Sequence, residues 1–333
     1  MEDPRPKVEG LPPPPGIIGS LIAGFDVVSG HIATILLPLG LDLFLWFGPR
    51  IRADQYYGRL QHSLLGSWPA PGPSAEQARQ FQEALAKSLE WLQTYNVFSM
   101  LRTFPVGIFS LLSEKAPPTT PLGLPAVVQV GSGWALFGWM ALATVLGWVC
   151  GGLYFRWVAS VVSEAAPFAA GRTVIQTVLY SLIWSLLAWI VGLPAMVLIY
   201  LLFLASPGLG QGVLLFLGFL SMWLIVPLFF SSHGIFVKKQ NVLVSILESM
   251  QMARFTLPTS SLFVLIVLLI GTGMNLLWSI PPADSWMTLI GLLGHAFITT
   301  ALLASSFVYY RDMTAWLRSV LERLRAGMPT QPA

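Results

Sequence analysis

Six hydrophobic segments, each long enough to cross a lipid bilayer and nearly free of charge, restrict the fold of this 333-residue chain more than any other feature. Hydrophobic residues make up 55% of the chain, and only 33 side chains are charged (18 basic plus 15 acidic). A soluble chain of this length needs more polar surface, whereas hydrocarbon requires about 20 apolar residues per crossing helix. We therefore expect an all-α, polytopic membrane bundle of about six transmembrane helices with additional interfacial amphipathic helices.

The expected spans cover residues 33–47, 134–158, 176–204, 212–230, 260–279 and 287–309. The first is short unless its helix begins nearer Ser29, and the third contains Pro194, which is expected to kink the helix or to divide it. Residues 1–16 are charged and end in a run of prolines. This composition predicts a disordered tail rather than a signal peptide, so the first span is expected to be an uncleaved anchor.

Basic residues predict the orientation of the chain. Two flank the loop between the second and third spans, three lie between the fourth and fifth, and four follow the sixth, whereas the intervening short loops have none. The positive-inside rule then predicts a multi-pass protein of the cell (plasma or inner) membrane with both termini in the cytoplasm. Arg50 and Arg52, directly after the first span, are the exception to this pattern.

The expected organisation follows from these spans. It comprises a disordered cytoplasmic tail (1–16), an interfacial helix with the first span (17–47), an extracytoplasmic helical loop (48–133), spans two to six with an interfacial helix at 241–255 (134–309), and a cytoplasmic amphipathic helix and tail (310–333).

The outer loop is expected to contain a helix of its own. Ser74 and Gln77 form a capping-box pattern, after which one face is apolar, comprising Phe81, Leu85, Leu89 and Leu92. This helix is interpreted either as a lid on the outer leaflet or as a face that docks a protein partner or gates a substrate. Residues 97–112 are apolar but contain Arg102, which favours an interfacial or re-entrant segment over a seventh span.

Two short stripes of apolar residues repeat at a constant offset along the chain. Ile18, Leu21, Ile22 and Phe25 precede the first span, and Leu243, Ile246, Leu247 and Met250 precede the fifth. The repetition indicates an internal structural duplication, although any interfacial helix carries such a stripe. A third amphipathic pattern, at residues 317–325, is expected to lie against anionic headgroups.

These features carry a resemblance. The order of "SLIAGFDVVSGHIATILLPLGLDLFLW", "FFSSHGIFVKKQN" and "VLVSILESMQMARFTLPTSSLFVLIVLLI" is similar to that of prokaryotic polytopic membrane proteins related to the membrane domain of glycerophosphodiester phosphodiesterases. In that group a helix with a small-residue face and a following Arg, here Ser245, Ser249 and Arg254, enters a membrane helix. The phosphodiesterase activity of those relatives resides in a separate soluble barrel, for which this chain has no room. The resemblance therefore implies no catalytic residue here.

Three polar side chains at membrane depth are candidates for an intramembrane polar site: Asp42, Asn275 and His295. Polar groups in hydrocarbon are costly, and these three lie in the outer half of the expected bundle. One interpretation is a polar cavity or ion path in which Asp42 is the charge and His295 titrates. The other is that Asp42 reaches the outer interface beside Arg50, while Asn275 and His295 form interhelical hydrogen bonds.

Several basic residues are expected to bind lipid headgroups at the inner interface, namely Arg156, Arg172, Lys238, Lys239, Arg254, Arg318, Arg323 and Arg325. Within the second span, Gly138, Gly147 and Gly151 offer a face for close helix packing or, alternatively, for a dimer seam. The single cysteine, Cys150, excludes an intramolecular disulfide.

Recognised catalytic and metal-binding motifs are missing from the sequence: there is no HExxH, no paired-cysteine motif, no phosphate loop and no GxGxxG. We therefore expect no catalytic residue, no metal and no cofactor. The basic residues form no nucleic-acid-binding face. The sequence favours a non-enzymatic membrane protein (a scaffold, an accessory subunit or a lipid-associated protein) with lipids and a possible protein partner, and a homo-oligomer is open. The alternative is a small transporter or channel.

Overall fold

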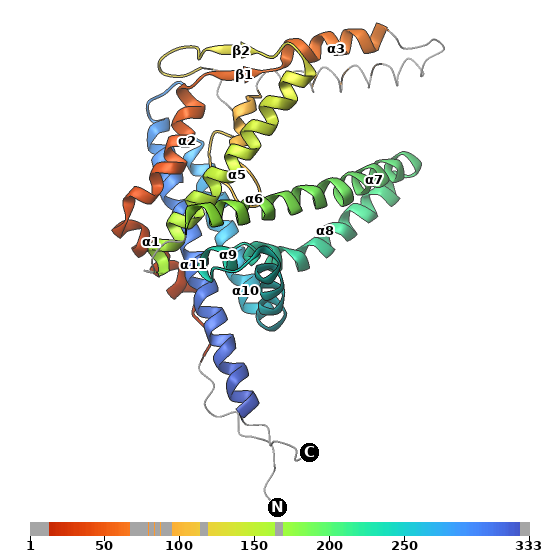
Figure 1. Cartoon of the computed structure of the whole chain (residues 1–333). Helices are drawn as coiled ribbons and strands as arrows, with labels where there is room; N and C mark the ends of the chain where they lie inside the picture. Colours follow the sequence, from red (N-terminus) through yellow and green to blue (C-terminus); the bar gives the residue numbers. More distant parts are fainter. Residues whose placement is uncertain are drawn as a thin grey trace, which may run out of the picture. The chain divides into compact units, whose positions relative to one another are not determined.

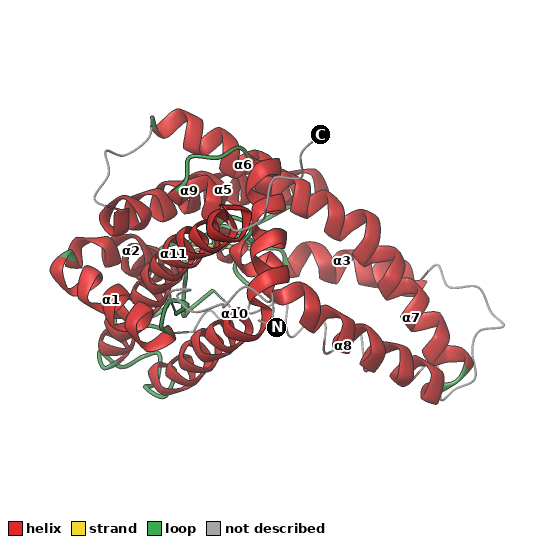
Figure 2. Ribbon diagram, turned by 90° about the horizontal axis from the view of Figure 1, so that it is seen from below, coloured by secondary structure: helices red, strands yellow, loops and turns green. Residues whose placement is uncertain are grey.

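The structure is a computed structural model that describes residues 13–66, 79, 83, 87, 95–113, 119–163 and 169–326. It confirms the all-α class, since helices account for most of these residues and the strands for very few (Figure 1, Figure 2). Among the described residues, four helices are long and apolar enough to cross a membrane, or up to six if each of two bent helix pairs is one span. Both bent pairs fall where the sequence predicts a span, the first and the fourth.

Along the chain, the helices and strands have the following bounds. They are α1 (Ile17–Gly30), the 3-10 turn η1 (Ile32–Ile35), α2 (Leu36–Phe47), β1 (Arg50–Arg52), α3 (Asp54–Gly66), the 3-10 turn η2 (Val97–Leu101), β2 (Val127–Gln129), α5 (Gly133–Ser163), α6 (Ala170–Leu187), the π-helical turn η3 (Ala188–Gly192), α7 (Leu193–Ala205), α8 (Pro207–Phe230), α9 (His233–Val237), α10 (Val242–Trp278) and α11 (Thr288–Ala326).

The chain divides into two compact units. Unit 1 comprises residues 1–32, 155–271 and 300–333, and unit 2 comprises residues 33–154 and 272–299. The core of unit 1 is formed around the second half of α11, where Ala304, Phe307, Tyr309 and Tyr310 are completely buried. Phe263 of α10 stacks on Tyr309 with a ring-centroid distance of 4.1 Å.

Unit 2 contains a two-stranded parallel sheet that was not predicted from the sequence. Strands β1 and β2 pair in the register Arg50↔Val127, and the side chain of Asn96 accepts a hydrogen bond from the backbone N–H of Ile51. Ile51 packs in a small apolar cluster with Ala53, Val97, Val130 and Leu136. Arg50 is fully buried, and burial, followed by the charge of Arg52, lowers the pKa of its guanidinium.

Pro194 deforms the third expected span without dividing it. Helices α6 and α7 continue into one another through the π-helical turn Ala188–Gly192, which lies just before the proline. Proline lacks the N–H that an α-helix needs at this point, and a wider turn reassigns the neighbouring bonds. In a membrane such a local adjustment keeps the backbone satisfied.

Helix α10 contains the expected interfacial helix and the expected fifth span in one continuous element. Thr256 has non-helical dihedral angles (φ −124°, ψ 18°), just before Pro258, so the helix is kinked between the two parts. The expected separate C-terminal helix is not observed, because α11 runs without a break from Thr288 to Ala326. No proline or glycine interrupts residues 295–326, so nothing ends the helix after the span.

The two segments that carry the repeated apolar stripe, which begin at Ile18 and at Leu243, correspond in burial as well as in sequence. Ser20, Gly24 and Val28 of α1 are buried, and so are their counterparts Ser245, Ser249 and Ala253 of α10. The apolar stripes point outward instead, since Ile18 and Leu243 are among the exposed large side chains. The helical dihedral angles are lost at His31 and at Thr256, which are related by the same offset. This agreement strengthens the inference of an internal duplication.

Candidate functional site

Asp42 of α2 is completely buried and accepts three hydrogen bonds from one segment of the chain. Its Oδ1 accepts from the Ser110 hydroxyl at 2.5 Å and from the Leu112 N–H at 3.1 Å, and its Oδ2 accepts from the Leu111 N–H at 3.1 Å. The expectation that Asp42 reaches the outer interface beside Arg50 is therefore wrong. Buried donors hold the carboxylate instead, because each of them would be left unsatisfied without it.

The segment that Asp42 binds is not helical beyond η2. Thr103 donates its hydroxyl hydrogen to the Val106 carbonyl at 2.7 Å, and residues 103–113 contain no helix or strand. Asp42 accepts from two of its N–H groups, and non-helical backbone in hydrocarbon would require such protein partners. The segment is therefore not a seventh spanning helix, and its interfacial or re-entrant position stays a prediction.

Two glycines of α5 allow the segment to lie directly against this helix. A Cβ at Gly147 would lie 2.6 Å from the Leu101 carbonyl oxygen, and one at Gly151 would lie 2.6 Å from the Gly107 Cα. Gly138, in contrast, faces open space. Gly147 therefore accommodates the end of η2 and Gly151 accommodates the non-helical segment, which corrects the expectation that these glycines pack against another membrane-spanning helix.

Asn275 and His295 form the second part of the candidate polar site. The side-chain oxygen Oδ1 of Asn275, on α10, lies 2.7 Å from Nδ1 of His295, on α11. This is an interhelical hydrogen bond of the kind expected from the sequence. Because an amide oxygen can only accept, Nδ1 carries the proton and Nε2 of the neutral ring presents a lone pair. His295 is only 2% exposed, and Nε2 has no hydrogen-bond partner among the described residues.

Arg102 is the charged residue whose field reaches both parts of the site, although burial affects the Asp42 carboxylate and the His295 ring more strongly. Its guanidinium donates a hydrogen bond to the Ser113 hydroxyl at 3.2 Å. In the sequence, Arg102 served only as an argument against a seventh span. A lone arginine in an apolar stretch was the signal that could have placed it in the site.

A second polar cluster, in unit 1, was not predicted from the sequence. The Glu248 carboxylate accepts hydrogen bonds from Lys238, at 2.5 Å, and from the Gln240 side-chain amide, while the Tyr310 hydroxyl lies 3.5 Å from it. The Lys238 ammonium also lies 5.4 Å from the centroid of the Tyr310 ring. This arrangement pairs the Glu248 carboxylate with a cation among partly buried groups.

His233 belongs to the same region. Its Nε2 is 2.8 Å from the Ser306 hydroxyl, and its ring contacts the rings of Phe229, Phe307 and Tyr310. Within the part of the chain that the structure describes, its Nδ1 has no hydrogen-bond partner. The signal was present in the sequence as a histidine within "FFSSHG", but nothing local showed that it would be enclosed by aromatic rings.

The expected lipid anchors differ in their surroundings. Most are exposed or half-buried, which suits headgroup binding, but Lys238 is engaged by Glu248 and belongs to the polar cluster. Arg254 lies near the ring of Phe255, and the side chain of Arg325 is outside the described part of the structure. The expected docking face, Phe81, Leu85, Leu89 and Leu92, also lies outside the described residues.

In the described ranges of the chain, no group of three or more His, Cys, Asp or Glu side chains is arranged to hold a metal ion. Comparisons with protein-family models, with curated proteins and with solved structures found no match to this chain. The resemblance to the membrane domain of glycerophosphodiester phosphodiesterases stays a prediction from the sequence.

Proposed function

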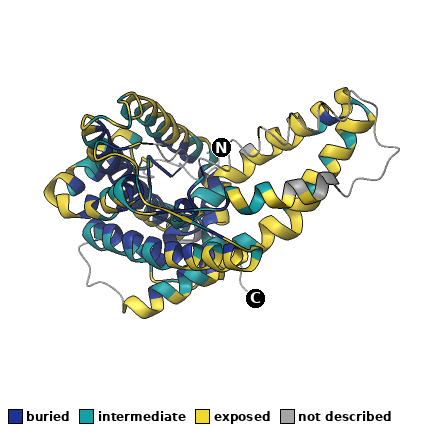
Figure 3. Cartoon of the chain, turned by 90° about the horizontal axis from the view of Figure 1, so that it is seen from above, coloured by how far each residue is buried: buried dark blue, intermediate teal, exposed yellow. Residues whose placement is uncertain are grey.

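We propose that this chain is a non-enzymatic protein of the cell membrane, acting as a scaffold, an accessory subunit or a lipid-associated protein. The observation that supports this proposal is the hairpin formed by α6, η3, α7 and α8. In its first arm, residues 170–205, none of the side chains in the most apolar 18-residue stretch is buried. Figure 3 colours most of the hairpin as exposed.

The hairpin exposes large apolar side chains that are not buried in the core. Large side chains such as Trp189, Leu198, Phe216 and Phe219 are exposed on both arms. Lipid tails are as apolar as these side chains, so burial alone does not drive helices together in a membrane. Close approach needs small residues, and Gly212 and Gly218 on α8 face open space. A second membrane protein that packs there fits the role of an accessory subunit.

The remaining parts of the proposal follow the sequence. Both termini are placed in the cytoplasm, residues 48–133 outside, and the exposed basic residues against phospholipid headgroups. The same proposal includes a protein partner at the expected outer face of Phe81, Leu85, Leu89 and Leu92. It does not include binding of nucleic acid.

The test compares co-purification of a companion protein with three variants of the chain. Gly212→Leu and Gly218→Leu place a side chain in the open space on α8, and Gly138→Leu does the same on α5 as the matched control. The proteins are extracted with native lipids in polymer discs, and the stoichiometry of any companion is quantified. The proposal predicts a stoichiometric companion that the α8 variants lose and the control retains. A companion unaffected by the α8 variants would contradict a contact at the hairpin.

A small transporter or channel is the second candidate, and one observation favours it. His295 Nε2 is buried without a hydrogen-bond partner among the described residues, and the charge of Arg102 reaches both His295 and the buried Asp42. Histidines and carboxylates inside a membrane protein commonly mark proton or ion paths. The double replacement of Asp42 by Asn and of His295 by Gln tests this candidate in proteoliposomes. Loss of solute or proton flux supports transport, whereas flux equal to that of empty vesicles for the unmodified protein contradicts it.

A further inference from the structure

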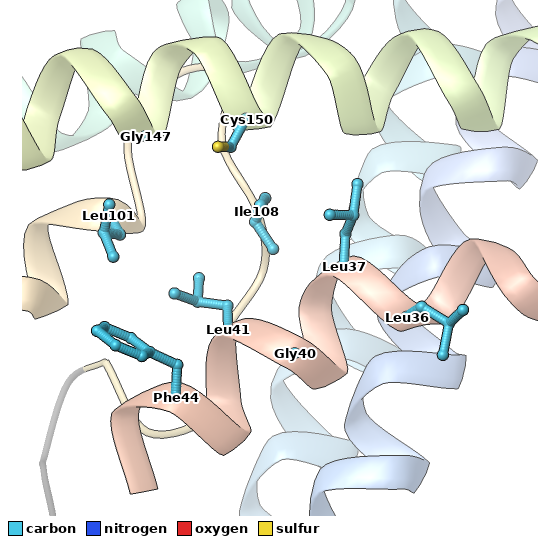
Figure 4. A pocket seen from close by; sticks show the side chains of 9 residues that line it. All are labelled: Leu36, Leu37, Gly40, Leu41, Phe44, Leu101, Ile108, Gly147 and Cys150. Carbon is cyan, nitrogen blue, oxygen red and sulfur yellow. The ribbon is translucent and has the colours of Figure 1, made fainter. Parts of the chain in front are cut away.

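Unit 2 contains an apolar cavity of about 350 Å³ between α2, the non-helical segment and α5 (Figure 4). It is lined by Leu36, Leu37, Gly40, Leu41, Phe44, Leu101, Ile108, Gly147 and Cys150. Leu41 and Ile108 are buried, whereas Leu36 and Phe44 are exposed, so the cavity opens toward the surroundings on their side.

The cavity follows from the way in which the non-helical segment is held. Asp42 binds the segment on one side and the glycines of α5 accommodate it on the other, so it lies between α2 and α5. Glycine at position 40 supplies no side chain to fill the space that results, and a Cβ there would meet nothing within 4 Å. The space is therefore a consequence of how Asp42 and the glycines of α5 hold the segment.

The lining determines what can occupy this space. Its side chains are hydrocarbon apart from the Cys150 thiol, and apolar cavities do not hold water but do take up apolar molecules. A cavity of about 150 Å³ accepts benzene, so by the same ratio a cavity of 350 Å³ accepts roughly fourteen carbons. That capacity corresponds to most of one acyl chain.

Charge complementarity points to a phospholipid as the source of that chain. Two charged residues are adjacent in sequence to lining residues: Asp42, which is buried and saturated with hydrogen bonds, and Arg102, which is exposed. Arg102 donates to the Ser113 hydroxyl, and a guanidinium, with five N–H donors, serves more than one acceptor at a time and binds phosphate well.

We propose that this cavity binds one acyl chain of a bilayer phospholipid, whose phosphate is held by Arg102. A phospholipid at this site would be the ligand of the lipid-associated role, and the inference rests on the membrane embedding that the proposed function assumes. It differs from contact with lipid at the exposed outer surface of the helices, because the acyl chain enters a cavity lined by named residues.

The experiment uses the purified full-length chain in vesicles that contain a phospholipid with a photoreactive group near the end of one acyl chain. Crosslinked peptides are mapped by mass spectrometry in the unmodified protein, in Gly40→Phe, in the milder Gly40→Leu, and in Gly138→Phe as the control. The proposal predicts crosslinks at residues 36–44 and 147–150, their loss in both Gly40 variants, and their retention in Gly138→Phe. The Gly40→Leu variant keeps the test valid if Gly40→Phe does not fold.

The headgroup part is tested by exchanging the probe for a diacylglycerol with the same photoreactive chain. We expect weaker crosslinking at the cavity for the diacylglycerol, and we expect Arg102→Gln to abolish the difference between the two lipids. Equal crosslinking by both lipids in the unmodified protein would overturn the role of Arg102.

Two other results overturn the cavity itself. Crosslinks that do not respond to the Gly40 variants would show ordinary contact with surrounding lipid, and their absence at these residues would show that another occupant, such as a partner helix, fills the space. A chain that does not partition into vesicles would instead refute the membrane embedding, so failure of the two proposals is distinguishable.

Discussion

Replacing Asp42 by asparagine tests whether the buried carboxylate holds the non-helical segment in place. Asparagine has nearly the same shape, and its Oδ1 can keep the hydrogen bonds from Ser110 and Leu112. Its amide nitrogen, however, replaces the Oδ2 that accepts from the Leu111 N–H. The substitution therefore places a donor against the part-buried Leu111 N–H without creating a cavity.

The size of the effect follows from the number of donors that lose their acceptor. One buried donor left without a partner costs about 1–3 kcal/mol, so Asp42→Asn is expected to destabilise the segment by that amount. Asp42→Ala leaves two backbone donors unsatisfied, and the cost rises to about 2–6 kcal/mol. Asp26 is exposed on α1, and Asp26→Asn is the matched control with an expected change near zero.

The assay is amide hydrogen exchange of the peptide that contains Leu111 and Leu112, measured in lipid discs. Because 1.4 kcal/mol corresponds to a factor of ten, the loss in Asp42→Asn predicts exchange that is about 5- to 150-fold faster if it proceeds by local opening. Asp26→Asn should leave the exchange unchanged. Unchanged protection of this peptide in both Asp42 variants would refute the reasoning that the carboxylate fixes the segment.

Three further predictions concern packing, charge and orientation. Gly147→Ala forces a Cβ against the Leu101 carbonyl at the end of η2, and overpacking of this kind costs about 1–3 kcal/mol, whereas Gly138→Ala should be neutral in thermal unfolding. Lys238→Met removes the partner of a carboxylate whose side chain is only 24% exposed, so we expect a loss of about 1.5–3 kcal/mol in the same assay. Arg79 is exposed and paired with Glu83, so Arg79→Gln should change the free energy of unfolding by less than about 0.5 kcal/mol. Equal losses of stability in Lys238→Met and Arg79→Gln would contradict this prediction. Reporter fusions at both ends should be active only on the cytoplasmic side, and termini on opposite faces would require an odd number of spans.

The fold class could be predicted from the sequence because long apolar stretches have few alternatives to membrane helices. The positions of distortion were predictable where proline causes them, as at Pro194. The continuity of α11 was not, since an amphipathic pattern at residues 317–325 looks the same in a separate surface helix and in the extension of a span. The β1–β2 pair was also missed, because its strands are three residues long and lie far apart in the sequence, at Arg50–Arg52 and Val127–Gln129.

Asp42, Asn275 and His295 could be singled out from the sequence because polar groups in apolar segments are costly. The hydrogen bond between Asn275 and His295 was among the predictions, but the partners of Asp42 were not, because Ser110 belongs to a segment whose path depends on the contacts of Gly147 and Gly151. The cavity could not be predicted either, because it also depends on the path of this segment. Nothing in the sequence around Gly40 indicates that the space beside it stays open.

Intact-complex mass spectrometry of the protein in a detergent-free polymer disc tests the central proposal most directly, because it weighs the chain together with everything that stays bound to it. A non-enzymatic accessory or scaffold protein predicts a mass that includes a stoichiometric companion protein, with phospholipid retained. The mass of the chain alone or of a homo-oligomer, together with solute flux that depends on Asp42 and His295, would contradict the proposal and establish the transport alternative.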